Sequence, residues 1–368
     1  MSSLARKIRV LVVDDSVVMR RLLSEVISSD PELEVAGYAA NGQIALALFD
    51  QVNPDIVTLD VEMPVMNGME TLQAMRTAGR ILPVIMFSTL TERGAEATIV
   101  ALALGASDYV AKPADSGYNS ARDRIREALL PRIKALCQRS LAPPPPQPIL
   151  RSASGRQVKL PNRIQVVAIG CSTGGPNALA QVLPGIPADF PVPLLIVQHM
   201  PPTFTRFLAQ RLTAQCQMGV AEAGDGELLK PGRMWIAPGG YHLAVARQSQ
   251  ETRLRIHQEA PENSCRPSVD VLFRSVAQVF SSHALAVVLT GMGQDGLRGC
   301  EMLAQSGAEI VAQDEPTSVV WGMPGFVARA GLAHAVLPIS EIAAHIVRRV
   351  TAFRPLTCAS ARPLGVAS

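Results

Sequence analysis

The chain has 368 residues, which at roughly 150 residues per domain predicts two domains or three, and 48% of its residues are apolar, enough for a sizeable core in each. With 18% charged residues and no apolar run of the roughly 18 residues that cross a bilayer, the composition excludes a disordered chain and argues against membrane insertion. The six cysteines are scattered without a C-x-x-C pair, which disfavours a disulfide framework or zinc ribbon, and the first residues do not form a signal peptide, so we expect a cytoplasmic protein.

Charge is distributed unevenly along the chain. Residues 1–125 contain 11 Lys and Arg against 16 Asp and Glu, a net charge of −5, whereas the remainder contains 23 against 15, a net charge of +8. Opposite charges favour docking of one half on the other. The basic residues of the second half are spread out rather than clustered, so we do not expect nucleic acid as a partner.

The first half alternates apolar strands with amphipathic helices. We predict a last helix over about Ser120–Cys137 and strands over Ile8–Val13, Leu33–Ala39, Ile56–Leu59, Pro83–Phe87 and Asp108–Ala111. Such an alternation predicts a five-stranded, doubly wound parallel sheet of the flavodoxin-like kind, an α/β fold with helices on both faces. Ligands of such sheets bind beyond the carboxyl ends of the strands.

Five chemically suitable residues follow these strands: Asp14, Asp15, Asp60, Ser88 and Lys112. Carboxylates at one sheet edge repel one another unless a cation lies among them, and an all-oxygen ligand set suits Mg²⁺. Asp60 could then attack a phosphoryl donor, while Lys112 neutralises the phosphoryl oxygens and Ser88 donates a hydrogen bond to one of them. The alternative is that the two consecutive aspartates cap a helix, Asp60 closes a turn and Lys112 is a surface charge. Finding all five at strand ends favours the phosphoryl site.

A proline-rich segment separates the halves. Residues 138–163 contain six prolines, of which Pro143 to Pro146 are consecutive, and this predicts an extended spacer, with a ligand for an SH3-like domain as the alternative. We therefore expect a domain over residues 1–125, a helix end and linker over 126–163, and a second domain over 164–354. A tail over residues 355–368 could be disordered.

The alternation of strands and helices resumes after the linker. We predict strands over Gln165–Ile169, Leu194–Gln198, Leu285–Thr290 and Ile310–Gln313, and an antiparallel insertion or sheet extension within about residues 219–258. The second domain should therefore be a three-layer α/β domain with a mostly parallel sheet and a small antiparallel extension.

A serine lies between the first predicted strand of this half and the helix after it. The segment Gly170–Gly175, with Ser172, fits the G-x-S-x-G pattern, in which small residues expose a serine hydroxyl at a helix N-terminus. A phosphate-binding turn or a helix N-cap at Ser172 are the alternatives. Nothing near Cys171 suggests a depressed pKa, which disfavours it as the nucleophile.

A base and a carboxylate would complete a catalytic triad with this serine. Among six histidines, His199 directly follows a predicted strand, and Asp295 lies just past another one. The segment around Asp295 also contains a G-x-G-x-x-G pattern, but a carboxylate inside that pattern would repel a dinucleotide pyrophosphate. Asp270 and His283 would instead give the order Ser, Asp, His that α/β-hydrolases have, but both residues fall in or beside a predicted helix. The sequence therefore favours Ser172, His199 and Asp295.

Two groups of motifs carry a family resemblance. VVDDS at 12–16, LDVEMPVMNG at 59–68, Ser88 and AKP at 111–113 resemble a response-regulator receiver domain. This resemblance implies phosphorylation of Asp60 by a chemotaxis-type sensor histidine kinase. It also implies Mg²⁺ held by Asp14, Asp15 and Asp60 together with the main chain near Glu62, and phosphate contacts from Lys112 and Ser88.

The segments IGCSTGGP, IVQHMPPTFT, RPSVDVLF, VLTGMGQDG and DEPTSVVWGMPG resemble the chemotaxis protein-glutamate methylesterases. The resemblance implies that Ser172, His199 and Asp295 hydrolyse γ-glutamyl methyl esters on methyl-accepting chemoreceptors, with release of methanol, and deamidate particular receptor glutamines. It implies no cofactor in the catalytic domain, and an oxyanion hole that includes the Met292 N–H and one near Thr173. A non-enzymatic adaptor and a DNA-binding output domain are the alternative functions.

Overall fold

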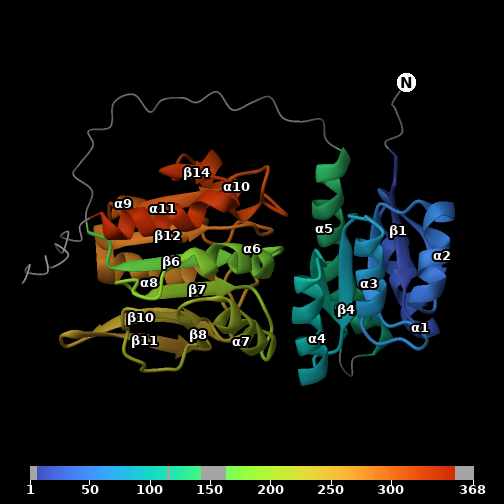
Figure 1. Ribbon diagram of the computed structural model, residues 1–368, viewed down its shortest axis with the longest axis horizontal. Helices are drawn as coiled ribbons and strands as arrows, with labels where there is room; N and C mark the ends of the chain where they lie inside the picture. Colours follow the sequence, from blue (N-terminus) through green and yellow to red (C-terminus); the bar gives the residue numbers. More distant parts are fainter. Residues whose placement is uncertain (1–5, 114–116, 142–162, 353–368) are drawn as a thin grey trace, which may run out of the picture.

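The computed structural model describes residues 6–113, 117–141 and 163–352, which form two domains (Figure 1). Most of the predicted linker and the whole predicted tail, 355–368, lie outside the described residues. None of the helices in the described ranges is both long enough and apolar enough to cross a membrane.

The N-terminal domain is the predicted five-stranded parallel sheet. Its strand order is β2-β1-β3-β4-β5. The strands are β1 (Ile8–Val13), β2 (Leu33–Ala39), β3 (Ile56–Asp60), β4 (Val84–Ser88) and β5 (Asp108–Ala111), and the helices are α1 (Val17–Ser28), α2 (Gly42–Val52), α3 (Gly68–Thr77), α4 (Glu92–Ala103) and α5 (Tyr118–Leu141). Every residue of β3 and β4 is buried because helices cover both faces, which explains their nearly continuous apolar sequence.

The cap of α1 decides what the consecutive aspartates do. The hydroxyl of Ser16 accepts the Met19 N–H and caps the helix, so neither Asp14 nor Asp15 is needed there. The alternative of an aspartate N-cap is therefore wrong, and the aspartate side chains remain at the edge of the sheet.

The C-terminal domain contains a seven-stranded parallel sheet in the order β14-β13-β12-β6-β7-β9-β8. Its strands are β6 (Val166–Cys171), β7 (Leu194–Gln198), β8 (Gly219–Glu222), β9 (Arg233–Ile236), β12 (Ala284–Val288), β13 (Glu309–Gln313) and β14 (Ala335–Leu337). Around them lie α6 (Gly175–Val182), α7 (Phe204–Gln215), α8 (Val269–Phe280), α9 (Leu297–Gln305), α10 (Met323–Arg329) and α11 (Ile339–Thr351), with short 3₁₀ turns at Leu183–Gly185 and Ser281–His283.

The segment 219–258 is only partly antiparallel. Strands β10 (His242–Gln248) and β11 (Glu251–His257) form a separate antiparallel hairpin, as predicted for this segment. Strands β8 and β9 instead extend the main sheet in parallel, with Leu194 of β7 opposite Met234 of β9. The turn residues between short strands mark where the chain reverses locally, but they do not say beside which strand it returns.

The two domains are docked on each other (Figure 1). Helix α4 packs against α7 and α6, and the ring of Tyr109 at β5 stacks on the ring of Phe204 with centroids 5.0 Å apart. Across the same boundary Arg206 forms an ion pair with Glu92, and the Thr173 hydroxyl donates a 2.8 Å hydrogen bond to Asp108. The acidic domain therefore covers the edge of the basic domain at which β6 and β7 end.

A glycine in β6 allows close packing of helix α8 and gives a stability prediction. A Cβ on Gly170 would lie 2.4 Å from a methyl group of Val269, whereas a Cβ on Gly219 would meet nothing within 4 Å. We expect Gly170→Ala to lower the free energy of unfolding by about 1–3 kcal/mol, and Gly219→Ala to change it by less than about 0.5 kcal/mol.

Urea unfolding followed by tryptophan fluorescence measures this difference, because the two tryptophans of the chain, Trp235 and Trp321, both belong to the C-terminal domain. Equal unfolding midpoints for the two variants would contradict the packing argument.

Candidate active site

The parallel pairing of β6 and β7 brings Ser172 and His199 to one sheet edge. Cys171 lies opposite Gln198 in the ladder, so the next residue of each strand leaves the sheet at the same level. The His199 N–H donates to the Cys171 carbonyl at 3.2 Å, and the Ser172 N–H donates to the Thr290 carbonyl beyond β12 at 3.0 Å. Three strand ends therefore meet around the serine.

The imidazole of His199 is fixed by the buried carboxylate of Asp295. The distance from Nε2 to Oδ2 is 2.8 Å, and Asp295 is only 2% exposed. Since an ionised carboxylate only accepts hydrogen bonds, Nε2 carries the proton in the neutral imidazole, and Nδ1 then keeps a lone pair. That lone pair can take a proton from a nearby hydroxyl.

Asp295 remains ionised because several donors surround it. Its carboxylate accepts the N–H groups of Val269 and Asp270 at the start of α8, at 2.7 and 3.1 Å, and the hydroxyl of Ser268 at 2.8 Å. Burial by itself would raise the pKa of Asp295, but hydrogen bonds from His199, Val269 and Ser268 hold it below its usual range. The positive end of the α8 dipole contributes in the same direction.

The protonated form of His199 is strongly stabilised. Burial would lower the pKa of the imidazole, but the hydrogen bond to Asp295 and the contact with Cys265 outweigh it and raise the pKa to about 9. At neutral pH the imidazole is therefore mostly an imidazolium in this arrangement.

The main chain near Ser172 offers two unused donors. The N–H groups of Thr173 and Met292 make no hydrogen bond within the described residues, whereas the Ser172 N–H is taken by Thr290. The N-cap of α6 is Gly174, at φ +78°, so the alternative of Ser172 as a helix cap is wrong. The Ser172 hydroxyl makes no hydrogen bond to His199 in the described residues, so a proton transfer requires a reorientation of at least one side chain.

Sequence reasoning missed Cys265. Its thiol lies 3.5 Å from Nδ1 of His199, the ring nitrogen that carries the lone pair. The residue is delivered by a tight turn in which Glu262 and Cys265 exchange backbone hydrogen bonds, while Asn263 and Ser264 have φ values of +50° and +60°. Two consecutive left-handed residues are typical of a type I′ turn, which favours Asn, so the Asn-Ser pair was the available signal.

The same turn supports the carboxylate of Asp295. The Asn263 amide donates to Asp295 and to Asp270, at 2.9 Å each. Asp270 also accepts the Gly299 N–H, so it helps to hold α8, α9 and the turn together. His283 lies at the opposite end of the sheet, before β12, so the alternative pairing of Asp270 with His283 is not formed.

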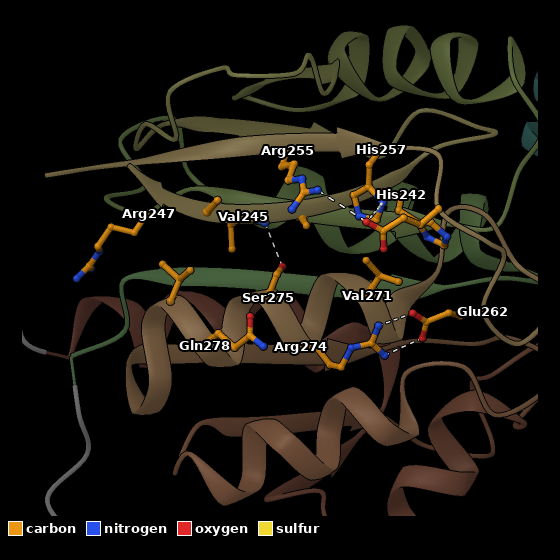
Figure 2. A pocket seen from close by; sticks show the side chains of 14 residues that line it. His242, Val245, Arg247, Arg255, His257, Glu262, Val271, Arg274, Ser275 and Gln278 are labelled. Atoms are coloured by element: carbon orange, nitrogen blue, oxygen red, sulfur yellow. Dashed lines mark hydrogen bonds and ion pairs between the residues drawn. The ribbon is translucent and has the colours of Figure 1, made fainter. Parts of the chain in front are cut away.

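Next to this turn lies a pocket of about 350 Å³ between the β10–β11 hairpin and α8, and side chains that line it fix the turn (Figure 2). In it the guanidinium group of Arg274 donates two hydrogen bonds to the Glu262 carboxylate. The buried His242 accepts the Ser268 N–H on Nδ1 and donates from Nε2 to the Ala260 carbonyl. Residues on both sides of Cys265 are thus fixed by side chains that do not line the active site.

The structure disfavours Cys171 as a nucleophile. Its side chain is fully buried, and burial raises the pKa of the thiol, so the thiolate that a nucleophilic cysteine needs is disfavoured.

The second group of predicted residues meets at the edge of the N-terminal sheet. The Lys112 ammonium lies 2.7 Å from Asp60 and 3.1 Å from Asp14. Burial, together with repulsion from Asp14, raises the pKa of Asp60 to about 6 although Lys112 opposes the shift. Asp15 and Ser88 line the same pocket of about 280 Å³, and the Ser88 hydroxyl donates to the Gly94 carbonyl of α4 at 2.8 Å.

This edge fits a divalent cation. Asp14, Asp15 and Asp60 each have a carboxylate oxygen within 4.8 Å of the others, and the buried Oδ2 of Asp14 accepts no well-aligned hydrogen bond. An oxygen-only set of this kind suits a hard cation such as Mg²⁺.

Each of the two domains matches a known protein family. A family model described as CheB methylesterase matches residues 167–346, and one described as response regulator receiver domain matches residues 10–120. The protein-glutamate methylesterase/protein-glutamine glutaminase of Trichodesmium erythraeum is 50% identical over 94% of this chain and 99% of the relative. The protein of the same name from a Nocardioides species is 49% identical over 95% of this chain and 97% of the relative.

A solved structure agrees with these sequence relatives. The catalytic domain of Thermotoga maritima CheB methylesterase superposes with a TM-score of 0.50 and 40% identity, and the match covers 51% of this chain and 99% of that one. With relatives matched over nearly their full length, the chain belongs to the family of protein-glutamate methylesterases/protein-glutamine glutaminases, in which it carries a receiver domain before a methylesterase domain.

Proposed function

We propose that this chain hydrolyses γ-glutamyl methyl esters on chemoreceptors, releasing methanol, and converts particular receptor glutamines to glutamate. The hydrogen bond between His199 and the buried Asp295, beside Ser172 at the shared sheet edge, carries the proposal. The names of the relatives support both activities.

The reaction uses the hydroxyl of Ser172 and Nδ1 of His199, the ring nitrogen that does not bond to Asp295. Nδ1 takes the hydroxyl proton while Oγ attacks the ester carbonyl, and the unused N–H groups of Thr173 and Met292 suit the oxyanion that develops. The imidazolium then gives its proton to the departing methoxide, which leaves as methanol. Water attacks the acyl-enzyme with His199 again as base, and glutamate is released. For a glutamine side chain the leaving group is ammonia and the remaining steps are the same.

Activity is regulated, in this proposal, by phosphorylation of Asp60 from a chemotaxis-type histidine kinase. Asp14, Asp15 and Asp60 would hold Mg²⁺, which neutralises phosphoryl oxygens when bound. Lys112 and Ser88 would contact the phosphoryl group.

The docking of the receiver domain suggests how phosphorylation reaches the active site. The Ser88 hydroxyl now bonds to Gly94 of α4, the helix that packs on α7. A phosphoryl group on Asp60 competes for that hydroxyl and would displace α4 and β5 from the catalytic domain. Thr173, bonded to Asp108, would then be released beside Ser172.

The first prediction from the proposed function concerns the nucleophile. Methanol release from methylated receptor should increase with a small-molecule phosphodonor plus Mg²⁺, and Ser172→Ala should reduce it by several orders of magnitude under either condition. Asp60→Asn should retain the basal rate and lose the stimulation. If Ser172→Ala kept more than about a tenth of the rate, the triad would be wrong and a non-enzymatic adaptor would become the better reading.

The second prediction concerns pH. Because the base must be neutral and the pKa of His199 is about 9, kcat/KM should rise with pH, about tenfold per unit between pH 6.5 and 8.5, and level off above 9. Cys265→Ser should move this limb to lower pH, because the thiol helps to raise the pKa. A flat profile from pH 6 to 9 would mean that His199 does not titrate as the base in this range.

The third prediction concerns the domain boundary. Tyr109→Ala removes the ring that stacks on Phe204, so we expect the basal rate to rise several-fold and the phosphodonor to add little. Tyr38→Ala is the control, since Tyr38 lies on β2 away from the boundary and is 48% exposed. An unchanged basal rate in Tyr109→Ala would show that docking does not limit activity.

A further inference from the structure

The thiol of Cys265 and Nδ1 of His199 form a pair of possible metal ligands, of which the proposed reaction uses only the histidine. Both side chains line a pocket of about 650 Å³ at the domain boundary, so small solutes have room to reach them. We propose that Cys265 and His199 bind a thiophilic divalent transition-metal ion, above all Zn²⁺, and that this ion reversibly inhibits the enzyme.

The distance between the two ligand atoms matches tetrahedral zinc. With Zn–S of about 2.3 Å and Zn–N of about 2.05 Å, a tetrahedral angle separates the two ligand atoms by about 3.6 Å. Cys265 Sγ and His199 Nδ1 are 3.5 Å apart. An ion could therefore enter by displacing the thiol proton and the Nδ1 proton of the imidazolium, since the two ligand atoms already have the spacing that it needs.

The hydrogen bond on the other ring nitrogen also suits a metal ligand. Histidines that bind metals usually donate their second N–H to a carboxylate, which fixes the ring and raises its basicity. His199 donates Nε2–H to Asp295 in this way. Asp295 is close enough to be considered a third ligand, but its oxygens already accept hydrogen bonds from His199, Ser268 and Val269, so we assign it to the support of the ring.

The ligand pair is held rigidly, which reduces the entropy lost on binding. Cys265 closes the turn that begins at Glu262, and the two hydrogen bonds from Arg274 anchor that turn on α8 (Figure 2). Two protein ligands leave two positions of the tetrahedron for water.

Other sites in the described residues suit this ion less well. Cys137, Cys171 and Cys300 are buried, and burial raises the pKa of the partly exposed Cys216 to about 11. The receiver carboxylates offer only oxygen, which suits Mg²⁺ better than a thiophilic ion.

Inhibition follows because the metal ion and the Ser172 proton need the same lone pair on Nδ1 of His199. A metal on Nδ1 prevents His199 from accepting the Ser172 proton, so this part of the inference rests on the proposed function, whereas metal binding itself does not. The experiment therefore measures binding and activity separately.

Binding is tested with Co²⁺ as a spectroscopic probe in the full-length protein, because cobalt occupies zinc sites and its thiolate complexes absorb in the near ultraviolet. Wild type and Cys216→Ser should both show the thiolate-to-cobalt band and the intense visible bands of tetrahedral cobalt. Cys265→Ser should lose the thiolate band. Absence of the band in wild type, or its persistence in Cys265→Ser, would overturn the proposal, and the wild-type spectrum alone decides if the variant does not fold.

Activity is tested by methanol release with Zn²⁺ at micromolar concentration and excess Mg²⁺. Wild type and Cys216→Ser should lose at least tenfold in rate and recover it with a chelator. Cys265→Ser, compared with its own metal-free rate, should lose less than twofold. Equal inhibition in Cys265→Ser would overturn the inhibitory site, whereas a cobalt band in a protein with no esterase activity would support the metal site and remove the proposed function.

Discussion

The hydrogen bond between Asp295 and His199 is the interaction on which the active site depends. A buried carboxylate is unfavourable unless donors surround it, and Asp295 is surrounded by the first N–H groups of α8, the Ser268 hydroxyl and the Asn263 amide. These donors keep the carboxylate ionised, and the ionised carboxylate fixes the tautomer of His199. This arrangement depends on the position of α8, on the register of β6 and β7, and on the turn at 262–265.

Placing the reactive groups at strand ends has a second consequence, because the same edge is also the surface on which the receiver domain docks. Thr173, the residue after Ser172, bonds to Asp108 of β5, and the ring of Tyr109 next to it stacks on Phe204. Lys112, which contacts the receiver carboxylates Asp14 and Asp60, lies at the other end of β5, only a few residues along the chain from these contacts. The phosphorylation site and the catalytic serine are therefore connected through β5 and the segment that follows β6.

The turn that carries Cys265 shows how a surface pocket can support a buried site. Arg274 and Glu262 pair in the pocket of Figure 2, and the turn that they anchor places Asn263 on Asp295 and Cys265 on His199. The thiol raises the pKa of the base and so carries a cost at neutral pH. A ligand pair of this geometry makes the base sensitive to metal ions as well as to protons.

The sequence by itself determined the strands and the residues at their ends. Apolar runs such as those of β1, β3 and β7 predict buried parallel strands, and the strand-end rule then selects Asp60, Ser172 and His199, because carboxyl ends of parallel strands share an edge. Only the tertiary structure decided that Cys265 contacts His199 and that Thr173 contacts Asp108, pairs separated by 66 and 65 residues. It also decided that β8 and β9 run parallel to the main sheet. The reason is physical: local periodicity and turn chemistry fix what a segment forms, whereas its neighbours depend on packing between segments that are distant in sequence.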